Sequence, residues 1–347
     1  MSRHVLVARQ DSVGDVLLAG PAVRAVAAGA DRVTLLCGPR GRAAAELLPG
    51  VDEVVVAHAA WIDAEPQRAT RAGVDALVDR LTDLAVDQAL VLTSFHQSPL
   101  PLALLLRMAG VPTIAATSVD YPGSLLDIRH RVDDDLHEVE RALSLAATLG
   151  YRLPDGDDGR LRVHPPQPTD LPELGGGPYV VVHPGASVPA RAWSPERHAA
   201  LVGALVAEGR RVVVTGDAAE RPLTTRVVGE RRPSVVDLGG RVDLGGLAGV
   251  LAGAAAVVVG NTGPAHLAAA VGTPVVSLFS PVVPAVRWRP WGVPQVLLGD
   301  QLVACAGSRA RSCPVPGHPC LDTIPVAEVV AAVDRLAPVR QNQEVAG

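Results

Sequence analysis

The sequence contains no lysine, and all 31 of its basic residues are arginine. A P-loop nucleotide site needs the lysine of G-x-x-x-x-G-K-[ST], so this absence excludes that class of protein. Any cation that binds phosphate here must be an arginine, whose planar fork differs from the point charge of lysine. No G-x-G-x-x-G follows the first apparent strand, so the fingerprint of NAD-binding enzymes is missing as well.

Aromatic residues are scarce, at 3% of a chain in which 48% of residues are hydrophobic. The core must therefore be built from Val, Leu and Ala, as is typical of buried parallel strands covered by helices. The net charge is -5 and the arginines are spread along the chain, so we expect no nucleic-acid partner. A length of 347 residues favours two domains.

Long apolar runs are also absent. No run reaches the roughly 18 apolar residues of a membrane span, and the N-terminal run is too short for a signal peptide. We therefore expect a cytoplasmic protein, which could still associate peripherally with a membrane.

The four cysteines lack the paired C-x-x-C spacing of a standard zinc site. Cys37 ends an apparent strand and is interpreted as a small buried hydrophobe. The segment CAGSRARSCPVPGHPC favours a proline-stiffened loop with reduced thiols. The alternative is a zinc site made by Cys305, Cys313, His318 and Cys320.

Strand and helix patterns alternate along the chain, which predicts two βα series. The first contains the short runs HVLVA, RVTLLC, EVVVA and QALVLT, and the second contains YVVVH, RVVVT, SVVDL, AAVVVG and PVVSLF. Prolines and glycines interrupt the pattern near residues 165–178. We predict an α/β protein of two Rossmann-like domains facing a central cleft, with domains over 1–165 and 179–338, a linker over 166–178, and a disordered tail over 339–347.

Two strand-to-helix turns carry the chemistry. GNTGPAHLAAAVGTP, residues 260–274, follows a valine-rich strand and opens a helix, whose N-terminal N–H groups suit a phosphate. In the first half, Asp11, Ser12, Gly14 and Asp15 follow strand HVLVA. Carboxylates there are candidates for a general base, and the alternative is that Asp11 or Ser12 caps the helix while Asp15 complements its dipole.

Several ordered blocks resemble glycosyltransferase family 9, the bacterial heptosyltransferases that use ADP-heptose. RQDSVGDVLLAGPAVRAV resembles the family's R-x-D-S-x-G-D-x-x-x-x-x-P-A-x-R, and LHEVERALSLAATLG resembles its H-E-V-E-R-x-L segment. VVVHPGAS with ARAWSPERHAAL, the signature GNTGPAHLAAAVGTPVVSLFSPVVPAVRWRPWG and the late GHPCLDTI are similar to further family blocks.

The resemblance implies the glycosyltransferase B fold and an inverting reaction that needs no metal or other cofactor. It implies an N-terminal acceptor domain and a C-terminal nucleotide-sugar domain. Asp15 would be the base, Thr262, Gly263 and His266 would hold the donor diphosphate, and Arg191 takes the place of the family's phosphate-binding lysine. The partners would be an ADP-sugar and either a glycan or a small-molecule acceptor.

This sequence departs from the family at Asn261, where the family has an aspartate associated with sugar hydroxyls. Further donor-side candidates follow strands of the second half: His183, Ser187, Thr215, Gly216 and Glu220. For His183 the alternative is a role in a capped turn. A carboxylate can accept from two ribose hydroxyls, which favours Glu220 as the ribose contact, while Asp217 has helix capping as an equal alternative. Arg287, Trp288 and Arg289 are interpreted as a packing anchor.

Acceptor-side candidates beyond the first turn are His96 with Gln97, and His137 with Glu138. The alternative for the last pair is a solvated, charged helix start. Two other functions remain open: a nucleotide-sugar 2-epimerase of the same fold, and a nucleotide-sugar-binding protein without turnover. Asp15 argues against the second, because a pure binder has no need of a base.

Overall fold

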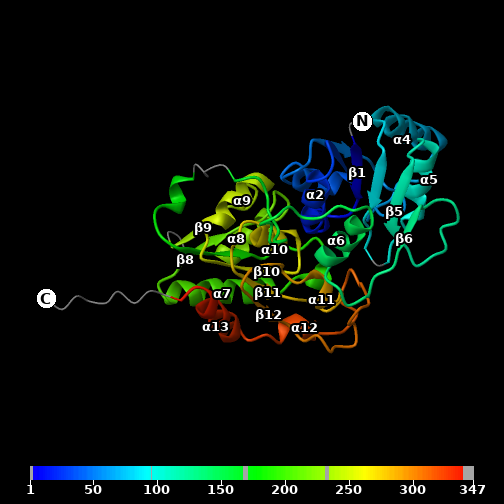
Figure 1. The fold of residues 1–347 in the computed structure, drawn as a ribbon. Coiled ribbons are helices and arrows are strands. Elements are labelled where there is room, and N and C mark those ends of the chain that lie inside the picture. Colours follow the sequence, from blue (N-terminus) through cyan, green and yellow to red (C-terminus); the bar gives the residue numbers. More distant parts are fainter. Residues whose placement is uncertain (1–2, 95, 167–170, 231–233, 339–347) are drawn as a thin grey trace. The chain divides into compact units, whose positions relative to one another are not determined.

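A computed structural model describes residues 3–94, 96–166, 171–230 and 234–338. The chain forms two compact units, Met1–His164 and Pro165–Gly347, each built on a six-stranded sheet (Figure 1). The predicted tail 339–347 lies outside the described residues, as does part of the predicted linker 166–178.

The first unit has a parallel sheet in the order β3-β2-β1-β4-β5-β6. Its strands are β1 (His4–Arg9), β2 (Arg32–Cys37), β3 (Glu53–Val56), β4 (Gln88–Val91), β5 (Thr113–Thr117) and β6 (Ile128–His130). Its helices are α1 (Val13–Leu18), α2 (Gly20–Ala27), the 3₁₀ turn η1 (Pro39–Gly41), α3 (Arg42–Ala45), α4 (Arg71–Leu84), α5 (Leu100–Met108) and α6 (Glu138–Thr148).

The side chains of β1 lie alternately on the two faces of this sheet. Leu6 and Ala8 belong to a core that includes Leu81 of α4 and Leu102 of α5. Helices α2 and α6 pack against one another, and α6 contacts β5 and β6. Because both faces are covered, β1 is buried along its whole length, which explains its continuous apolar run.

The second unit has a parallel sheet in the order β12-β11-β10-β7-β8-β9. Its strands are β7 (Tyr179–His183), β8 (Arg211–Val214), β9 (Val235–Asp237), β10 (Ala256–Gly260), β11 (Val275–Leu278) and β12 (Gln295–Leu298). Its helices are η2 (Pro172–Leu174), η3 (Pro189–Arg191), α7 (Pro195–Ala207), α8 (Arg221–Val228), α9 (Leu244–Ala252), α10 (Gly263–Ala270), α11 (Ala285–Trp288), α12 (Pro319–Asp322) and α13 (Val326–Leu336).

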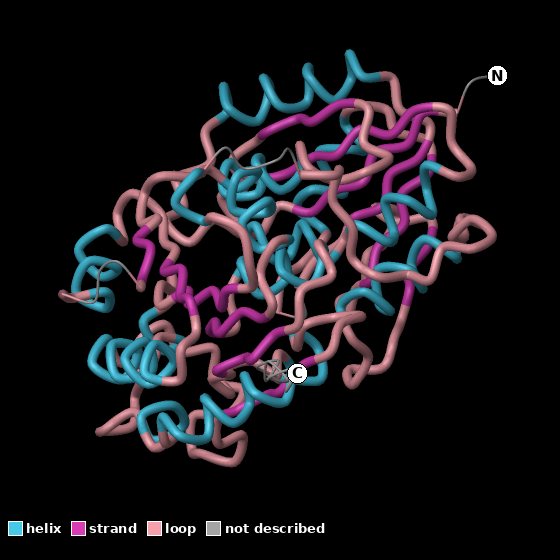
Figure 2. The backbone as a smooth tube through the Cα atoms, turned by 90° about the vertical axis from the view of Figure 1, so that its left-hand side faces the viewer, coloured by secondary structure: helices cyan, strands magenta, loops and turns pink. Residues whose placement is uncertain are grey.

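The core of the second unit is almost entirely aliphatic. Val180, Val182 and Val258 of the sheet pack with Leu201 of α7 and Val329 of α13. Figure 2 shows strands (magenta) among helices (cyan), and within this unit α9 contacts α10 while α13 contacts α7. Small and branched aliphatic side chains fill these layers, as the scarcity of aromatic residues predicts.

Counted along its own chain, each sheet has the strand order 3-2-1-4-5-6 of the Rossmann fold. The prediction of two Rossmann-like domains is therefore confirmed. In such sheets ligands bind at the carboxyl ends of the two central strands, where the strand order reverses. These positions follow β1 and β4 in the first unit, and β7 and β10 in the second.

Candidate active site

A buried arginine organises the carboxyl end of β1. The Arg9 side chain is 5% exposed, and its guanidinium lies 2.9 Å from Asp11 Oδ2, 2.9 Å from Asp15 Oδ1 and 3.4 Å from Glu138 Oε2. Its NH2 group also donates to Ser94 Oγ after β4, at 3.0 Å. Residues from β1, α1, α6 and the end of β4 thus meet around one cation.

The turn into α1 is shaped by Ser12 and Asp15. Ser12 occupies the N-cap position but makes no capping bond, and its hydroxyl instead donates to Asp15 Oδ2 at 2.8 Å. Gly14 is buried in the first turn. The interpretation of Asp11 as a helix cap is wrong, because its carboxylate pairs with Arg9 and accepts a hydrogen bond from the Gln97 amide.

Three carboxylates share the charge of Arg9, and Arg141 contributes a second guanidinium 3.7 Å from Glu138. Burial alone would lower the pKa of Arg9, but Asp11, Asp15 and Glu138 outweigh it and raise that pKa. Burial raises the pKa of Asp11 to about 6, with Asp15 adding to the shift and Arg9 opposing it. Exposed fractions of the side chains are 8% for Asp11, 16% for Asp15 and 3% for Glu138, so Asp15 is the most accessible of the three.

The start of α6 supplies a structural residue and a site residue. His137 is 1% exposed and caps the helix, with Nδ1 accepting from the Val139 N–H and Glu140 accepting from the His137 N–H. The solvated helix start considered as an alternative is wrong at Glu138, which is buried against Arg9 and Arg141. Sequence reasoning missed the role of Arg9, although it stands at the head of R-x-D-S.

The turn after β4 contributes Gln97 to the acidic cluster. Gln97 Oε1 accepts from the Ser94 N–H at 3.1 Å, while its amide nitrogen donates to Asp11. His96 is exposed in the same turn. Gln97 therefore connects the end of β4 to the acidic cluster.

In the second unit, β10 leads directly into α10, as residues 260–274 predicted. Thr262 is the N-cap residue with extended backbone, yet its hydroxyl makes no capping bond, and α10 begins at Gly263. His266 lies in the first turn and is 4% exposed. The first-turn N–H groups have no side-chain cap, which is the arrangement that favours an anion.

Arg191 lies beside this helix start. Its NH1 group donates to the Asn261 carbonyl at 3.4 Å, and a Cβ on Gly260 would lie only 2.8 Å from the Arg191 carbonyl oxygen. The glycine thus permits the close approach of η3 to β10. The Asn261 side chain donates to Ser280 O at 3.1 Å and accepts from Ser280 N at 3.2 Å, which joins the ends of β10 and β11.

The ends of β7 and β8 bring together His183, Thr215 and Glu220. His183 Nδ1 lies 3.0 Å from Thr215 Oγ1, and Nε2 lies 3.8 Å from Glu220 Oε2. Burial lowers the pKa of His183 to about 4, so the imidazole is neutral at pH 7. Burial raises the pKa of Glu220. Gly185 and Gly216 both pack against Glu220, and a Cβ on Gly185 would overlap its carboxylate.

Asp217 and Glu220 also close the turn before α8. Asp217 Oδ1 accepts from the N–H groups of Ala219 at 2.8 Å and Glu220 at 2.9 Å, so it stabilises the turn, whereas the N-cap position of α8 is occupied by Glu220. Glu220 Oε2 accepts from the Asp217 N–H at 2.9 Å. Ser187 is exposed in the loop between β7 and η3, so it lies in the same neighbourhood of the chain.

The late cysteine loop packs on η3. Cys305 is buried with Ala190 and Val282, and His318 Nε2 lies 3.2 Å from the Ala190 carbonyl. All four cysteines are free thiols. Within the described ranges, no three His, Cys, Asp or Glu residues are grouped so that they could hold a metal ion.

Residues 74–317 match the family described as "Glycosyltransferase family 9 (heptosyltransferase)". The chain belongs to glycosyltransferase family 9. It is 33% identical over 166 residues to lipopolysaccharide heptosyltransferase 3 of Escherichia coli, covering 46% of this chain and 47% of that protein. It is 34% identical over 238 residues to lipopolysaccharide heptosyltransferase 1 of Pseudomonas aeruginosa, covering 66% and 64%. These alignments span about half to two thirds of the curated relatives.

Solved structures of family 9 proteins share the fold over nearly the whole chain. The Escherichia coli ADP-heptose LPS heptosyltransferase II superposes with a TM-score of 0.71 at 20% identity, covering 97% of this chain and 98% of that one. The Escherichia coli heptosyltransferase WaaC with ADP gives 0.71 at 23% identity, covering 96% and 100%. At these identities the similarity establishes the fold. In the part of this chain that the structure describes, no helix is both long and apolar enough to span a membrane.

Proposed function

We propose that this protein is an inverting, metal-independent glycosyltransferase. It would transfer a sugar, with heptose from ADP-heptose as the first candidate, to a hydroxyl of a cell-envelope glycan or a small natural product. The observation that carries the proposal is the contrast between a partly accessible carboxylate, Asp15, after β1 and an uncapped helix start beside Arg191 after β10. The family relatives named as heptosyltransferases support the donor class.

The reaction would be a single displacement. The acceptor oxygen attacks the anomeric carbon from the face opposite the diphosphate, and its proton passes to the Asp15 carboxylate. The bond between the anomeric carbon and the phosphate oxygen breaks, and the electron pair leaves with the nucleoside diphosphate. Arg191 and the N–H groups at the start of α10 would stabilise the negative charge of this leaving group.

Arg9 has a positioning role in this proposal. Its ion pair with Asp15 at 2.9 Å and the hydrogen bond from Ser12 at 2.8 Å fix the carboxylate in one orientation. Removing either oxygen contact would change where the base points. The ribose would be held by Glu220 in the second unit, where His183 is neutral and can act only through hydrogen bonds.

The test is a panel of ADP-, UDP- and GDP-sugars incubated with the full chain, measuring release of nucleoside diphosphate with and without candidate acceptors. ADP-heptose should be consumed fastest, with slow hydrolysis when no acceptor is present. Conversion of a nucleotide sugar into its 2-epimer without acceptor would show an epimerase instead. ADP binding with no turnover of any donor would show a binding protein. If another nucleotide protects the protein thermally and ADP does not, the choice of base is wrong.

A further inference from the structure

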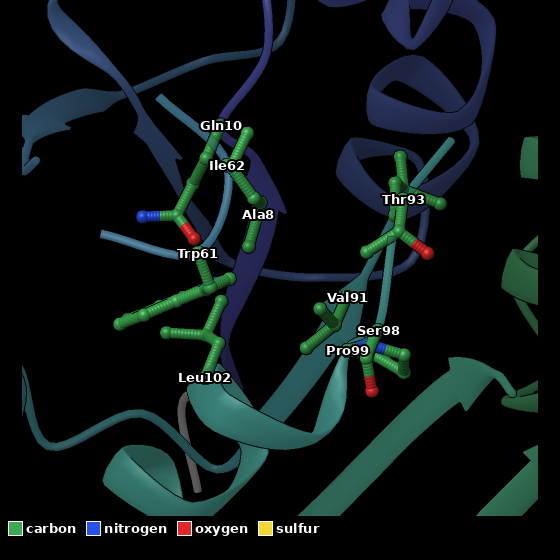
Figure 3. A pocket seen from close by; sticks show the side chains of 10 residues that line it. Ala8, Gln10, Trp61, Ile62, Val91, Thr93, Ser98, Pro99 and Leu102 are labelled. Atoms are coloured by element: carbon green, nitrogen blue, oxygen red, sulfur yellow. The ribbon is translucent and has the colours of Figure 1, made fainter. Parts of the chain in front are cut away.

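A second polar site lies at the carboxyl end of β1, on the sheet face opposite Arg9. Arg9 and Asp11 serve the acidic cluster, whereas Ala8 and Gln10 lie on the face covered by α4 and α5. Figure 3 shows Gln10 beside Trp61 of the loop after β3, while Thr93 and Ser98 of the segment between β4 and α5 line the same space on its other side. This is the point in the first sheet where the strand order reverses, the usual position of a ligand in such sheets.

Gln10 carries a buried amide without hydrogen bonds. The residue is 3% exposed, and neither its Nε2 nor its Oε1 atom has a partner. An unpaired buried polar group typically costs about 1–3 kcal/mol, so such groups are rare unless they have a use. Water does not satisfy this amide, because the space beside it has no room for a water molecule.

Trp61, which lines the same space, carries a second unpaired group. Its indole Nε1–H is buried and has no acceptor. Together, the two side chains offer donors from the indole and the amide nitrogen and an acceptor from the amide oxygen. A ligand that satisfies all of them must both donate and accept, which hydroxyl groups do and a carboxylate or phosphate does not.

Trp61 separates this narrow space from a larger cavity of about 280 Å³. The larger cavity lies between the loop 57–70 and α4, and its volume is close to the lower end of the roughly 300–1,000 Å³ typical of small-molecule sites. The cavity lining contains charged residues of both signs, Arg68 and Asp63. Asp63 also lies 2.9 Å from His58 Nδ1. Trp61 lines both spaces, whereas Gln10 lines only the narrow one, so a ligand in the cavity reaches Gln10 only if the Trp61 ring moves.

We propose that this cavity binds a neutral polyhydroxylated group such as one sugar ring or a polyol, and that the Trp61 ring moves on binding so that the ligand reaches Gln10. The Gln10 amide and the Trp61 N–H would bind its hydroxyls, while the indole face would cover its C–H surface. Within the proposed function, on which this assignment rests, the group is a part of the acceptor. Ser98 of this site is next to Gln97, which bonds Asp11 of the acidic cluster.

The experiment measures binding of two neutral probes, methyl α-D-glucopyranoside and myo-inositol, and one anionic probe, D-glucuronate, to the full chain without nucleotide. Calorimetry and ligand-observed NMR give the affinities, and thermal melts give Tm. At least one neutral probe should bind more tightly than glucuronate. Q10L should weaken that binding at least tenfold and also raise Tm, because it replaces an unpaired buried amide by an apolar side chain.

Trp61→Phe removes the N–H but keeps a ring, and should weaken the neutral probe severalfold. Trp193→Phe is the matched control, because the Trp193 Nε1–H is also buried without a partner but lies in the second unit. Binding should be unchanged in this control. The proposal is overturned if no neutral probe binds, if glucuronate binds more tightly, if Q10L keeps its affinity, or if Q10L lowers Tm. Probe binding by a protein that transfers no sugar would leave this site standing and remove the proposed function.

Discussion

The two units repeat one fold but place opposite charges at corresponding positions. After β1 and β4, at the strand-order reversal of the first sheet, Asp11, Asp15 and Glu138 surround a single Arg9. After β7 and β10, at the reversal of the second sheet, an arginine lies beside an uncapped helix start. The fold thus fixes where ligands bind, and the residues of the turns decide whether the position suits proton removal or anion binding.

The N-terminal turns of α1 and α10 also differ in their hydrogen bonds. In α1 the N-cap residue Ser12 gives its hydroxyl to a carboxylate of the same turn. In α10 the corresponding Thr262 caps nothing, and the first turn has no acidic residue. A carboxylate therefore lies at the helix start in the first unit, whereas the first turn of α10 in the second unit has neither a carboxylate nor a side-chain cap.

The largest expected effect is that of Asp15→Asn. Asparagine keeps the shape but cannot accept the proton, so kcat should fall by roughly 10²- to 10⁴-fold while donor affinity stays nearly unchanged. The measurement is a transfer assay with thermal melts to check folding. Asp83→Asn, an exposed carboxylate on α4, is the control and should keep full activity. Full activity in Asp15→Asn together with loss in Asp11→Asn would assign the base to Asp11.

Arg9→Met tests whether the first cluster depends on its cation. Without Arg9, buried carboxylates lose their main counter-charge, and removing one partner of a buried ion pair typically costs about 3–5 kcal/mol. Denaturant unfolding at pH 7 should show this loss. Arg24→Met is the comparison, because Arg24 pairs with the single carboxylate of Asp157 at 2.7 Å in the same unit. A smaller loss for Arg9→Met than for Arg24→Met would contradict the idea that three carboxylates depend on Arg9.

Arg191→Ala tests the arginine beside the start of α10 in the second unit. The charge beside α10 should contribute to diphosphate binding, so ADP affinity should fall by roughly 10- to 100-fold, in line with the ~1.5–3 kcal/mol of a hydrogen bond to a charged group. Arg191→Lys should retain part of the ADP affinity, because lysine keeps the positive charge but lacks the planar guanidinium. Calorimetry with ADP measures both, and Arg335→Ala, at an exposed position of α13, is the control. Unchanged ADP affinity in Arg191→Ala would remove Arg191 from the donor site.

The central strands of both sheets could be predicted from sequence because parallel strands buried on both faces have continuous apolar runs such as YVVVH and AAVVVG. The outer strands β5, β6 and β12 were missed. TIAAT consists of small residues, IRH spans three residues only, and the residues of QVLL are mostly half-buried, so none of them has this pattern.

The candidate site was predictable only where it is local in sequence. Asp11 and Asp15 follow their strand directly, and Thr262 opens its helix, so one strand-to-helix turn reveals each. Glu138 lies 129 residues after Arg9, and Trp61 comes from a different loop than Gln10. Such pairings depend on how strands and helices pack, and no local pattern of residues indicates them.

The smallest expected effect is a difference in pH dependence between the two units. The pKa of Asp11 is raised to about 6 in the folded state, so between pH 4 and 6 the folded protein holds more protons there than the unfolded chain. This contribution lowers stability as the pH rises through that range. The pKa of His183 is lowered to about 4, so between pH 4 and 6.5 the unfolded chain holds more protons and stability rises with pH.

The two substitutions that remove these groups should therefore change the pH slope in opposite directions. In Asp11→Asn the free energy of unfolding should rise more steeply with pH between 4 and 6 than in the wild type, because a negative contribution is lost. In His183→Gln it should rise less steeply, because a positive contribution is lost. Denaturant unfolding at pH 4.5, 5.5 and 6.5 measures the slopes, with Asp83→Asn as the control for a carboxylate that is exposed. Equal slopes in both variants would mean that these two buried groups do not set the response to acid, and that the charge contrast between the units does not extend to their stability.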